Sequence, residues 1–247
     1  MIGHYTIGAG IGTTTVLYFN RSREAGVVIF TNQQGILSKN GVLFITPLLP
    51  HFCMSEDRLV IDVIDNGGQW THREWRMLRY MGVDTQILAN NTPVAELREL
   101  DGLILSGGAA RVGLTGELGN CAAYLELDLP ILGICAGHQF MAGHYGGQAA
   151  EAPAPEFGAA TINLVDGGGP LFDGTPETQT VWESHNDEVV DLPEDFRITA
   201  SSKSCEIQAM ENSTLDRFGV QFHPEVNDSE YGAKIFENFV DICRRAL

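Results

Sequence analysis

The chain has 247 residues, 44% of them hydrophobic, and its net charge at pH 7 is −17 because 32 Asp and Glu outnumber 15 Lys and Arg. This length suits one large α/β domain, or one domain with an appendage. The acidic surface argues against binding to nucleic acid, whose phosphates it repels, and no apolar run reaches the roughly 20 residues of a membrane-spanning helix.

Residues 1–57 are predicted to form an N-terminal extension. Within them, residues 1–53 carry Glu24 as their only acidic residue, so that nearly all of the negative charge lies further along the chain. We predict that this stretch is either a mis-assigned upstream translation, with the native chain starting at or near Met54, or a poorly packed extension. An added pair of strands is the alternative. Mass spectrometry of the protein from its native host would test the predicted start.

The acidic part of the chain contains almost no lysine. Lys203 and Lys234 are the only lysines after residue 53. Excess carboxylate with so little lysine is typical of a surface adapted to high salt, where screening tolerates self-repulsion. An ordinary acidic cytosolic protein is the alternative.

From residue 58 onward, apolar strands alternate with helical patterns. Strands are predicted at 59–64, 83–88, 102–106 and 131–134, helices at 70–81 and 137–145, and a short helix that begins at Thr92-Pro93. This alternation favours a parallel sheet that is covered by helices on both faces and binds its ligands at the carboxyl ends of the strands.

After about residue 150 the pattern changes to strands in succession, which predicts an antiparallel addition to the same domain. The predicted strands are 159–165, 178–182, 197–201, 207–211 and 219–222, and an amphipathic helix at 230–245 follows them. We therefore expect one compact α/β domain over residues 58–247.

The cysteines form an odd and scattered set: Cys53, Cys121, Cys135, Cys205 and Cys243. Neither a C-x-x-C pair nor a Cys/His ligand spacing is present, so the sequence predicts no metal site and no disulfide framework. Free thiols fit a reducing cytoplasm, and the first residues lack the basic start of a signal peptide.

The segment Gly-Ile-Cys-Ala-Gly around Cys135 is the most informative stretch. A buried strand runs straight into the cysteine, glycines stand two residues before and after it, and a helix then begins. This is the layout of a nucleophile elbow, written G-x-C-x-G. The sharp turn raises the sulfur above the edge of the sheet, and the helix N-terminus favours the thiolate. A small structural cysteine at a strand end is the alternative.

A second segment, Gln-Phe-His-Pro-Glu, follows another apolar strand and ends at Glu225. A cysteine nucleophile needs a base that takes its proton and later protonates the leaving group, and the base needs a carboxylate that fixes its tautomer. His223 and Glu225 supply this pair, and Pro224 stiffens the connection between them. A lone His-Pro-Glu is typical of a solvated turn, so the catalytic interpretation depends on Cys135.

These two segments together resemble the paired motifs of the class I (triad) glutamine amidotransferases, and the resemblance extends through nearly all of the chain after residue 58. It implies a flavodoxin-like α/β fold with a mostly parallel sheet, helices on both faces and a small antiparallel addition. It also implies that Cys135 attacks the side-chain amide of L-glutamine and forms a γ-glutamyl thioester. His223 would be the general acid and base, oriented by Glu225.

The same resemblance implies roles for residues around the nucleophile. Leu-Ser-Gly-Gly matches the family's loop after the third strand, where Gly107 lets the backbone approach the substrate. The amides of Gly108 and Ala136 would bind the oxyanion of the tetrahedral intermediate. Ala109 stands where the family usually has proline. Gln139 would face the α-amino and carboxylate end of glutamine.

Two further segments narrow the resemblance to the glutaminases of GMP synthetases. Asp-Asn-Gly-Gly-Gln-Trp, at residues 65–70, resembles their Asp-Phe-Gly-Ser-Gln-Tyr, and residues 183–189 resemble their Ser-His-Gly-Asp segment. In that segment backbone groups hold the amino-acid end of the substrate, which implies that Ser184 and Asn186 bind glutamine. Asn186 replaces the family's glycine.

The partner follows from the same resemblance. The chain shows no Ser-Gly-Gly-Val-Asp-Ser loop of a pyrophosphatase domain, so it resembles the separate glutaminase subunit of a two-subunit enzyme, as in archaea. Its partner in a heterodimer would be an ATP-pyrophosphatase subunit that uses ATP and Mg²⁺ and converts xanthosine monophosphate (XMP) into GMP. No cofactor is expected in this chain, nor a nucleic-acid or membrane partner.

Three alternatives stay open at this point. A glutaminase subunit of another synthetase, such as anthranilate synthase, would carry Tyr-His-Ser where this chain has Ser-His-Asn-Asp. A stand-alone cysteine hydrolase of the γ-glutamyl peptidase type would act on γ-glutamyl peptides without a partner. A non-catalytic binding subunit is disfavoured by the intact cysteine, histidine and glutamate.

Overall fold

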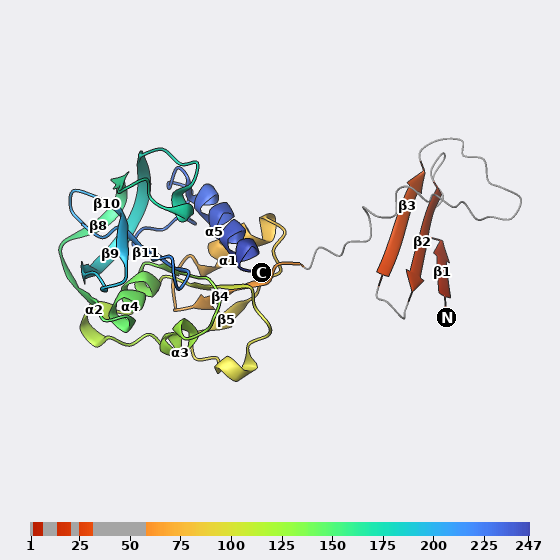
Figure 1. Cartoon of the computed structure of the whole chain (residues 1–247), viewed down its shortest axis with the longest axis horizontal. Helices are drawn as coiled ribbons and strands as arrows, with labels where there is room; N and C mark the ends of the chain where they lie inside the picture. The colour runs from red at the N-terminus through yellow and green to blue at the C-terminus, as the bar shows by residue number, and fades with distance from the viewer. Residues whose placement is uncertain (1, 7–13, 21–24, 32–57) are drawn as a thin grey trace, which may run out of the picture. The chain divides into compact units, whose positions relative to one another are not determined.

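The computed structural model divides the chain into two compact units, Met1–Asp57 and Arg58–Leu247 (Figure 1). The residues that it describes are 2–6, 14–20, 25–31 and 58–247. Among these residues, no helix is long and apolar enough to cross a membrane.

The described part of the first unit is a three-stranded antiparallel sheet in the order β1-β2-β3. Its strands are β1 Ile2–Thr6, β2 Thr14–Asn20 and β3 Ala25–Thr31. The strand β2 pairs with both of its neighbours, and its run of Thr, Val, Leu, Tyr and Phe is typical of strands. Met54 lies outside the described residues, so the start at that residue stays a prediction.

The second unit is built on a nine-stranded sheet in the order β5-β4-β6-β7-β12-β11-β10-β8-β9. Its strands are β4 Ile61–Asp65, β5 Ile87–Ala89, β6 Gly102–Leu105, β7 Ile131–Ile134, β8 Gln148–Leu164, β9 Thr178–Asp191, β10 Arg197–Ser201, β11 Ala209–Asn212 and β12 Arg217–Val220. The strands β5, β4, β6, β7 and β12 pair in parallel. Renumbered along the chain they follow the order 2-1-3-4-5, which is that of flavodoxin. The predicted flavodoxin-like sheet is confirmed.

The antiparallel addition consists of β11, β10, β8 and β9. It is dominated by the hairpin of β8 and β9, whose strands have 17 and 14 residues and extend well beyond the predicted 159–165 and 178–182. A bulge between Glu151 and Glu156 interrupts their pairing. The extension of β9 was not predicted because its sequence, Glu-Ser-His-Asn-Asp-Glu, lacks the apolar alternation of a half-buried strand.

Helices cover both faces of the sheet. They are α1 Thr71–Tyr80, α2 Val112–Thr115, α3 Cys121–Leu125, α4 Ala136–His144 and α5 Gly232–Ala246, with two 3₁₀ turns, η2 Val94–Glu96 and η3 Pro170–Phe172. Successive strand residues point to opposite faces: Val63 of β4 joins the core cluster that contains α1 and α5 residues, whereas Ile64 joins the cluster with α3 and α4 residues. Both layers are therefore anchored on the central parallel strands.

Two expectations require correction. The strand predicted at 219–222 as part of the antiparallel addition is β12, which pairs antiparallel with β11 but in parallel with β7, with Gly219 opposite Gly133. The short helix expected at Thr92-Pro93 is the 3₁₀ turn η2, and no side chain caps it. The helices α2 and α3 have four and five residues, which is too short to produce a helical period in the sequence.

Candidate active site

Cys135 stands on the sharp turn that joins β7 to α4. Its backbone angles are φ 50° and ψ −104°, a region that L-residues occupy only at a cost of about 1–3 kcal/mol. The amide of Cys135 donates to the carbonyl of Val220, 2.8 Å away, and its carbonyl accepts from the amide of Gln139 at 2.9 Å. These bonds hold the cysteine in the strained geometry of a nucleophile elbow.

The two glycines of the elbow are required by close backbone contacts. A Cβ on Gly133 would lie 2.7 Å from the carbonyl carbon of Gly137, and a Cβ on Gly137 would collide with the carbonyl oxygen of Leu105. The first turn of α4 therefore lies directly against β7 and β6. The spacing G-x-C-x-G thus reflects the packing that lifts the cysteine to the carboxyl edge of the sheet.

His223 and Glu225 form a buried ion pair at the same edge. Nδ1 of His223 lies 2.7 Å from Oε1 of Glu225, and both side chains are nearly inaccessible to solvent. Since a carboxylate only accepts, Nδ1 donates to it and Nε2 is left for the reaction. The ring of Trp70 meets the imidazole edge-on at 4.5 Å. The carboxylate and the indole thus fix the orientation of the imidazole.

The pKa of His223 reflects its neighbours. Burial lowers it, but the Glu225 carboxylate and the Cys135 thiol beside the imidazole outweigh burial and raise the pKa well above the ordinary value. The imidazolium is therefore favoured next to the sulfur, which is the charge distribution that a thiolate nucleophile needs. The structure brings together all three residues of the predicted triad.

The predicted oxyanion loop follows β6 and packs against the segment that follows β4. Asn66 donates from its side-chain nitrogen to the carbonyl of Ser106 at 2.8 Å. A Cβ on Gly68 would lie 2.5 Å from the carbonyl oxygen of Gly107, and one on Gly108 would collide with the carbonyl of Asn66. Only glycine fits this contact between the two segments, which holds Gly107 and Gly108 next to the nucleophile.

A cavity of about 270 Å³ joins these elements, close to the lower end of the size range of small-molecule sites. It is lined by the whole triad and by the predicted residues Gly107, Gly108, Gln139, Ser184 and Asn186. Ala136 is buried at the start of α4, where the helix itself offers its amide no acceptor. The oxyanion role of the Gly108 and Ala136 amides stays a prediction.

The predicted substrate-binding residues differ in their contacts. The backbone carbonyl of Ser184 lies 3.9 Å from Sγ of Cys135, opposite the nucleophile, and Asn186 is exposed at the cavity. The side-chain nitrogen Nε2 of Gln139 donates to the backbone carbonyl of Asp187 at 2.5 Å and to Oε1 of Gln221 at 3.1 Å. Gln139 therefore holds the second half of β9 in place, and its contact with glutamine stays a prediction.

Two groups at the cavity were not predicted from the sequence. Arg111 lies after β6 and pairs with Asp187, 2.7 Å away and 76 residues further along the chain. Glu74 of α1 is buried beside the triad, and burial, reinforced by the Glu225 carboxylate, raises its pKa well above the ordinary value. Asp187 belongs to the recognised Ser-His-Asn-Asp segment, but no local pattern marks Arg111 or Glu74 as site residues.

The chain is similar to known proteins over most of its second unit. The model of the family "Glutamine amidotransferase class-I" matches residues 62–243. A subunit of the glutamine-hydrolyzing GMP synthase of Thermoplasma acidophilum is 48% identical over 187 residues, which are 75% of this chain and 93% of that protein. The protein of the same name from Natronomonas pharaonis is 46% identical over 184 residues, covering 74% of this chain and 97% of its own.

Solved structures agree with the fold. A crystal structure from Thermoplasma acidophilum, assigned to the same GMP synthase subunit, matches with a TM-score of 0.72 and 47% identity over 76% of this chain and 95% of that chain. A glutamine amidotransferase from Thermotoga maritima matches with a TM-score of 0.57 at 19% identity, over 76% of this chain and 83% of that one. This second match supports the fold alone.

Proposed function

The chain belongs to the class I glutamine amidotransferase family, and we propose that it is the glutaminase subunit of a two-subunit GMP synthase. It hydrolyses L-glutamine to glutamate and ammonia, and the ammonia is used by an ATP-pyrophosphatase subunit that converts XMP into GMP. The observation that carries the proposal is the meeting of Cys135, His223 and Glu225 at one cavity. The relatives that are named as GMP synthase subunits, 41–48% identical to this chain, support the choice of synthetase.

The reaction begins with attack on the side-chain amide. The Cys135 thiolate forms a bond to the amide carbon, and the carbonyl oxygen becomes an oxyanion that the amides of Gly108 and Ala136 stabilise. The proton that left the thiol is held on Nε2 of His223 and passes to the amide nitrogen. The carbon–nitrogen bond then breaks, ammonia leaves, and a γ-glutamyl thioester remains on Cys135.

Hydrolysis of the thioester completes the cycle. A water molecule attacks the thioester carbon while Nε2 of His223 takes one of its protons. The carbon–sulfur bond breaks, glutamate is released and the thiolate of Cys135 is restored. Throughout both steps the hydrogen bond from Nδ1 to Glu225 keeps the imidazole in one tautomer and stabilises its charged form.

The substrate and the cofactors are divided between two chains in this proposal. The amino-acid end of glutamine is held near Gly107, Gln139, Ser184 and Asn186, which line the cavity. This chain uses no cofactor for hydrolysis, whereas the partner subunit binds ATP and Mg²⁺.

We place the complex in the cytoplasm and attribute the net charge of −17 to adaptation to high salt. Activity and melting temperature should then rise as KCl is raised from low to molar concentration.

Reconstitution with the synthetase tests the proposal. Ammonia that escapes into water cannot be used by the synthetase, so hydrolysis should wait until the partner is ready. In addition, Ala109 replaces the proline that usually stiffens the oxyanion loop. A misplaced oxyanion donor costs about a hundredfold in rate. The isolated chain is therefore expected to hydrolyse glutamine slowly. Addition of the ATP-pyrophosphatase subunit of the same organism, with ATP, Mg²⁺ and XMP at molar salt, should raise the rate at least tenfold and yield GMP.

The control for this experiment is the Cys135→Ala variant. It should support GMP formation from ammonium chloride but not from glutamine, because only the supply of ammonia is lost. Full activity of the lone chain, unchanged by the partner and its nucleotides, would contradict the assignment. Turnover of γ-glutamyl peptides under those conditions would favour a stand-alone hydrolase, and activation by an anthranilate synthase partner would favour a different synthetase.

A further inference from the structure

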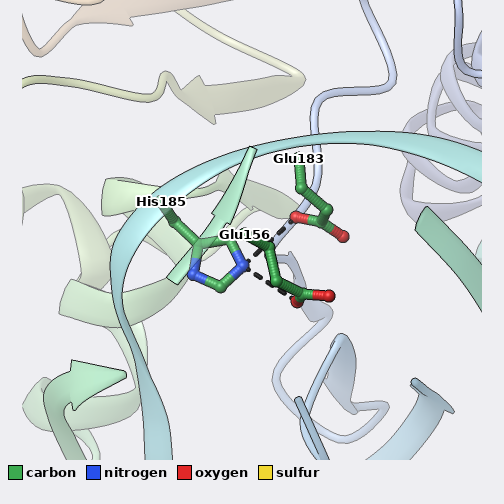
Figure 2. A group of neighbouring side chains, drawn as sticks. All are labelled: Glu156, Glu183 and His185. Carbon is green, nitrogen blue, oxygen red and sulfur yellow. Dashed lines mark hydrogen bonds and ion pairs between the residues drawn. The ribbon is translucent and has the colours of Figure 1, made fainter. Parts of the chain in front are cut away.

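Three side chains with metal-ligating atoms converge on one point (Figure 2), and one of them, His185, lines the active-site cavity. Glu156 of β8 stands directly opposite His185 of β9. Glu183 lies two residues before His185, so the alternation of the strand directs both side chains to the same face. Nε2 of His185 lies 3.2 Å from Oε2 of Glu156 and 3.4 Å from Oε2 of Glu183. One imidazole nitrogen therefore faces two carboxylates.

The carboxylate of Glu183 is buried without a donor. Its side chain has no exposed surface, and neither carboxylate oxygen has a hydrogen-bond partner in the described residues. Glu156 is better satisfied, because Ser204 donates to its Oε1 at 2.5 Å and Gln208 donates to its Oε2 at 3.0 Å. A buried carboxylate that accepts no hydrogen bond is among the most unfavourable groups in a protein interior. Its presence here points to a positive centre between the side chains.

The tautomer of His185 strengthens this conclusion. Nδ1 lies 3.1 Å from the carbonyl oxygen of Asp187, and since a carbonyl only accepts, Nδ1 carries the hydrogen. In the neutral ring, Nε2 then presents its lone pair to the two carboxylates. A histidine that donates from one nitrogen to a backbone carbonyl while the other faces carboxylate oxygens has the arrangement of a metal ligand with its supporting hydrogen bond.

The separations fit a particular coordination geometry. Zn²⁺ binds histidine nitrogen and carboxylate oxygen at about 2.0–2.2 Å in a tetrahedral arrangement. Two ligands of such a tetrahedron lie about 3.3–3.6 Å apart, close to the 3.2 and 3.4 Å between Nε2 of His185 and the oxygens of Glu156 and Glu183. All three ligand atoms lie within 4.8 Å of one another. The two distances from the imidazole nitrogen therefore match those between the ligands of one tetrahedral ion.

We propose that Glu156, Glu183 and His185 form a binding site for a divalent transition-metal ion, with Zn²⁺ as the best match to one imidazole and two carboxylates. A bound ion would link β8 to the segment of β9 that lines the cavity. That segment includes Ser184, whose carbonyl faces the sulfur of Cys135. The ion would therefore hold one wall of the active site in place and take no part in bond breaking.

Local sequence spacing does not reveal this site. Glu156 and His185 are 29 residues apart, and they meet only because the bulged pairing of β8 with β9 sets Glu156 opposite His185. The sequence therefore predicted no metal. A proton is the alternative positive centre, since burial, with the Glu156 carboxylate adding to it, raises the pKa of Glu183 to about 8.

A measurement of metal binding to the full chain distinguishes a metal ion from a proton as the positive centre between these side chains. The protein is stripped with a chelator and titrated with Zn²⁺ in competition with a chromophoric chelator. We expect one tightly bound Zn²⁺ per chain, weakened at least tenfold in Glu183→Gln and in His185→Gln. Mg²⁺ should not compete, because imidazole favours transition metals. Saturating Zn²⁺ should raise the melting temperature of the wild type but not that of Glu183→Gln.

The matched control is His144→Gln. His144 also pairs with a carboxylate, Glu126 at 2.8 Å, but that carboxylate is largely exposed, so loss of this pair should leave Zn²⁺ affinity unchanged. If Glu183→Gln does not fold, Glu156→Gln replaces it, since Glu156 is partly exposed. Equal affinity in wild type and Glu183→Gln, or sulfur bound to the ion by X-ray absorption, would overturn the proposal. Absence of binding would leave the proton as the positive centre and overturn it too.

Discussion

Gly107 lies so close to His223 that a Cβ on the glycine would come within 3.0 Å of Cε1 of the imidazole and 3.5 Å of Cβ of Cys135. We predict that Gly107→Ala pushes the imidazole away from the sulfur and lowers kcat for glutamine hydrolysis about a hundredfold. The fold should persist. Gly143→Ala is the control, because a Cβ there meets nothing within 4 Å. It should retain full activity and gain about 0.5–1 kcal/mol of stability. Equal kcat in both variants would contradict the prediction.

Cys135 should be the only described cysteine that a glutamine-analogue electrophile labels. Cys121, Cys205 and Cys243 are free but buried, and burial raises the pKa of Cys121 to about 12 and raises the pKa of the other two thiols well above the ordinary value. Their thiolate fractions at neutral pH are therefore negligible. Peptide mapping should find the label on Cys135 and none in Cys135→Ala, whose circular dichroism should match the wild type. A label on another described cysteine would refute the assignment of the nucleophile.

Glu225→Gln should destabilise the protein in a pH-dependent manner. The pKa of His223 is raised in the folded state because Glu225 and Cys135 outweigh burial. A raised pKa contributes stability that is fully present below the unfolded value of about 6.5 and is lost as pH rises through the folded pKa. The difference in unfolding free energy between wild type and variant should therefore be larger below the unfolded pKa than in alkaline solution. Urea denaturation in both ranges measures it, and a difference independent of pH would argue against the ion pair.

Glu74→Gln should have the opposite effect. The carboxyl of Glu74 has its pKa raised by burial and by the Glu225 carboxylate, so the folded state favours its protonated form. That contribution to stability is fully present below the unfolded value of about 4.3 and is lost as pH rises. The side-chain amide of the Glu74→Gln variant is neutral at every pH, so the variant does not lose this stability as pH rises. The variant should match the wild type in acid and be more stable in mildly alkaline solution. Lower stability than the wild type in alkaline solution would mean that Glu74 is ionised and paired.

The parts of the site that could be predicted are those encoded in short segments. The elbow around Cys135 is specified by two glycines that pack on β6 and β7, and His223 stands two residues before the carboxylate that orients it. Both segments follow buried strands with strong apolar patterns. The parallel pairing of β4, β5, β6 and β7 could be predicted as well, because strand and helix alternate along the chain before residue 150.

The parts that could not be predicted depend on pairing between distant segments. Arg111 meets Asp187 only after the segment that follows β6 packs on β9, and Glu156 meets His185 only through the register of a bulged hairpin. Register is set by a whole strand pair and by its turn, so it cannot be predicted from any single residue. The parallel pairing of β12 was missed for the same reason, since nothing local distinguishes it from the antiparallel strands before it.

The pairing of β12 with β7 also determines when the enzyme becomes active during its synthesis. The glycine contacts of the elbow lie between β6, β7 and α4 and can form once α4 has left the ribosome, whereas the hydrogen bond from the Cys135 amide to the carbonyl of Val220 needs β12. The base enters only with β12, after the long hairpin of β8 and β9 has been made, and such late, non-local pairing is the slow part of folding. A nascent or truncated chain that ends before Arg217 thus carries its nucleophile without a base. Such a chain is therefore expected to hydrolyse no glutamine until its base has been made.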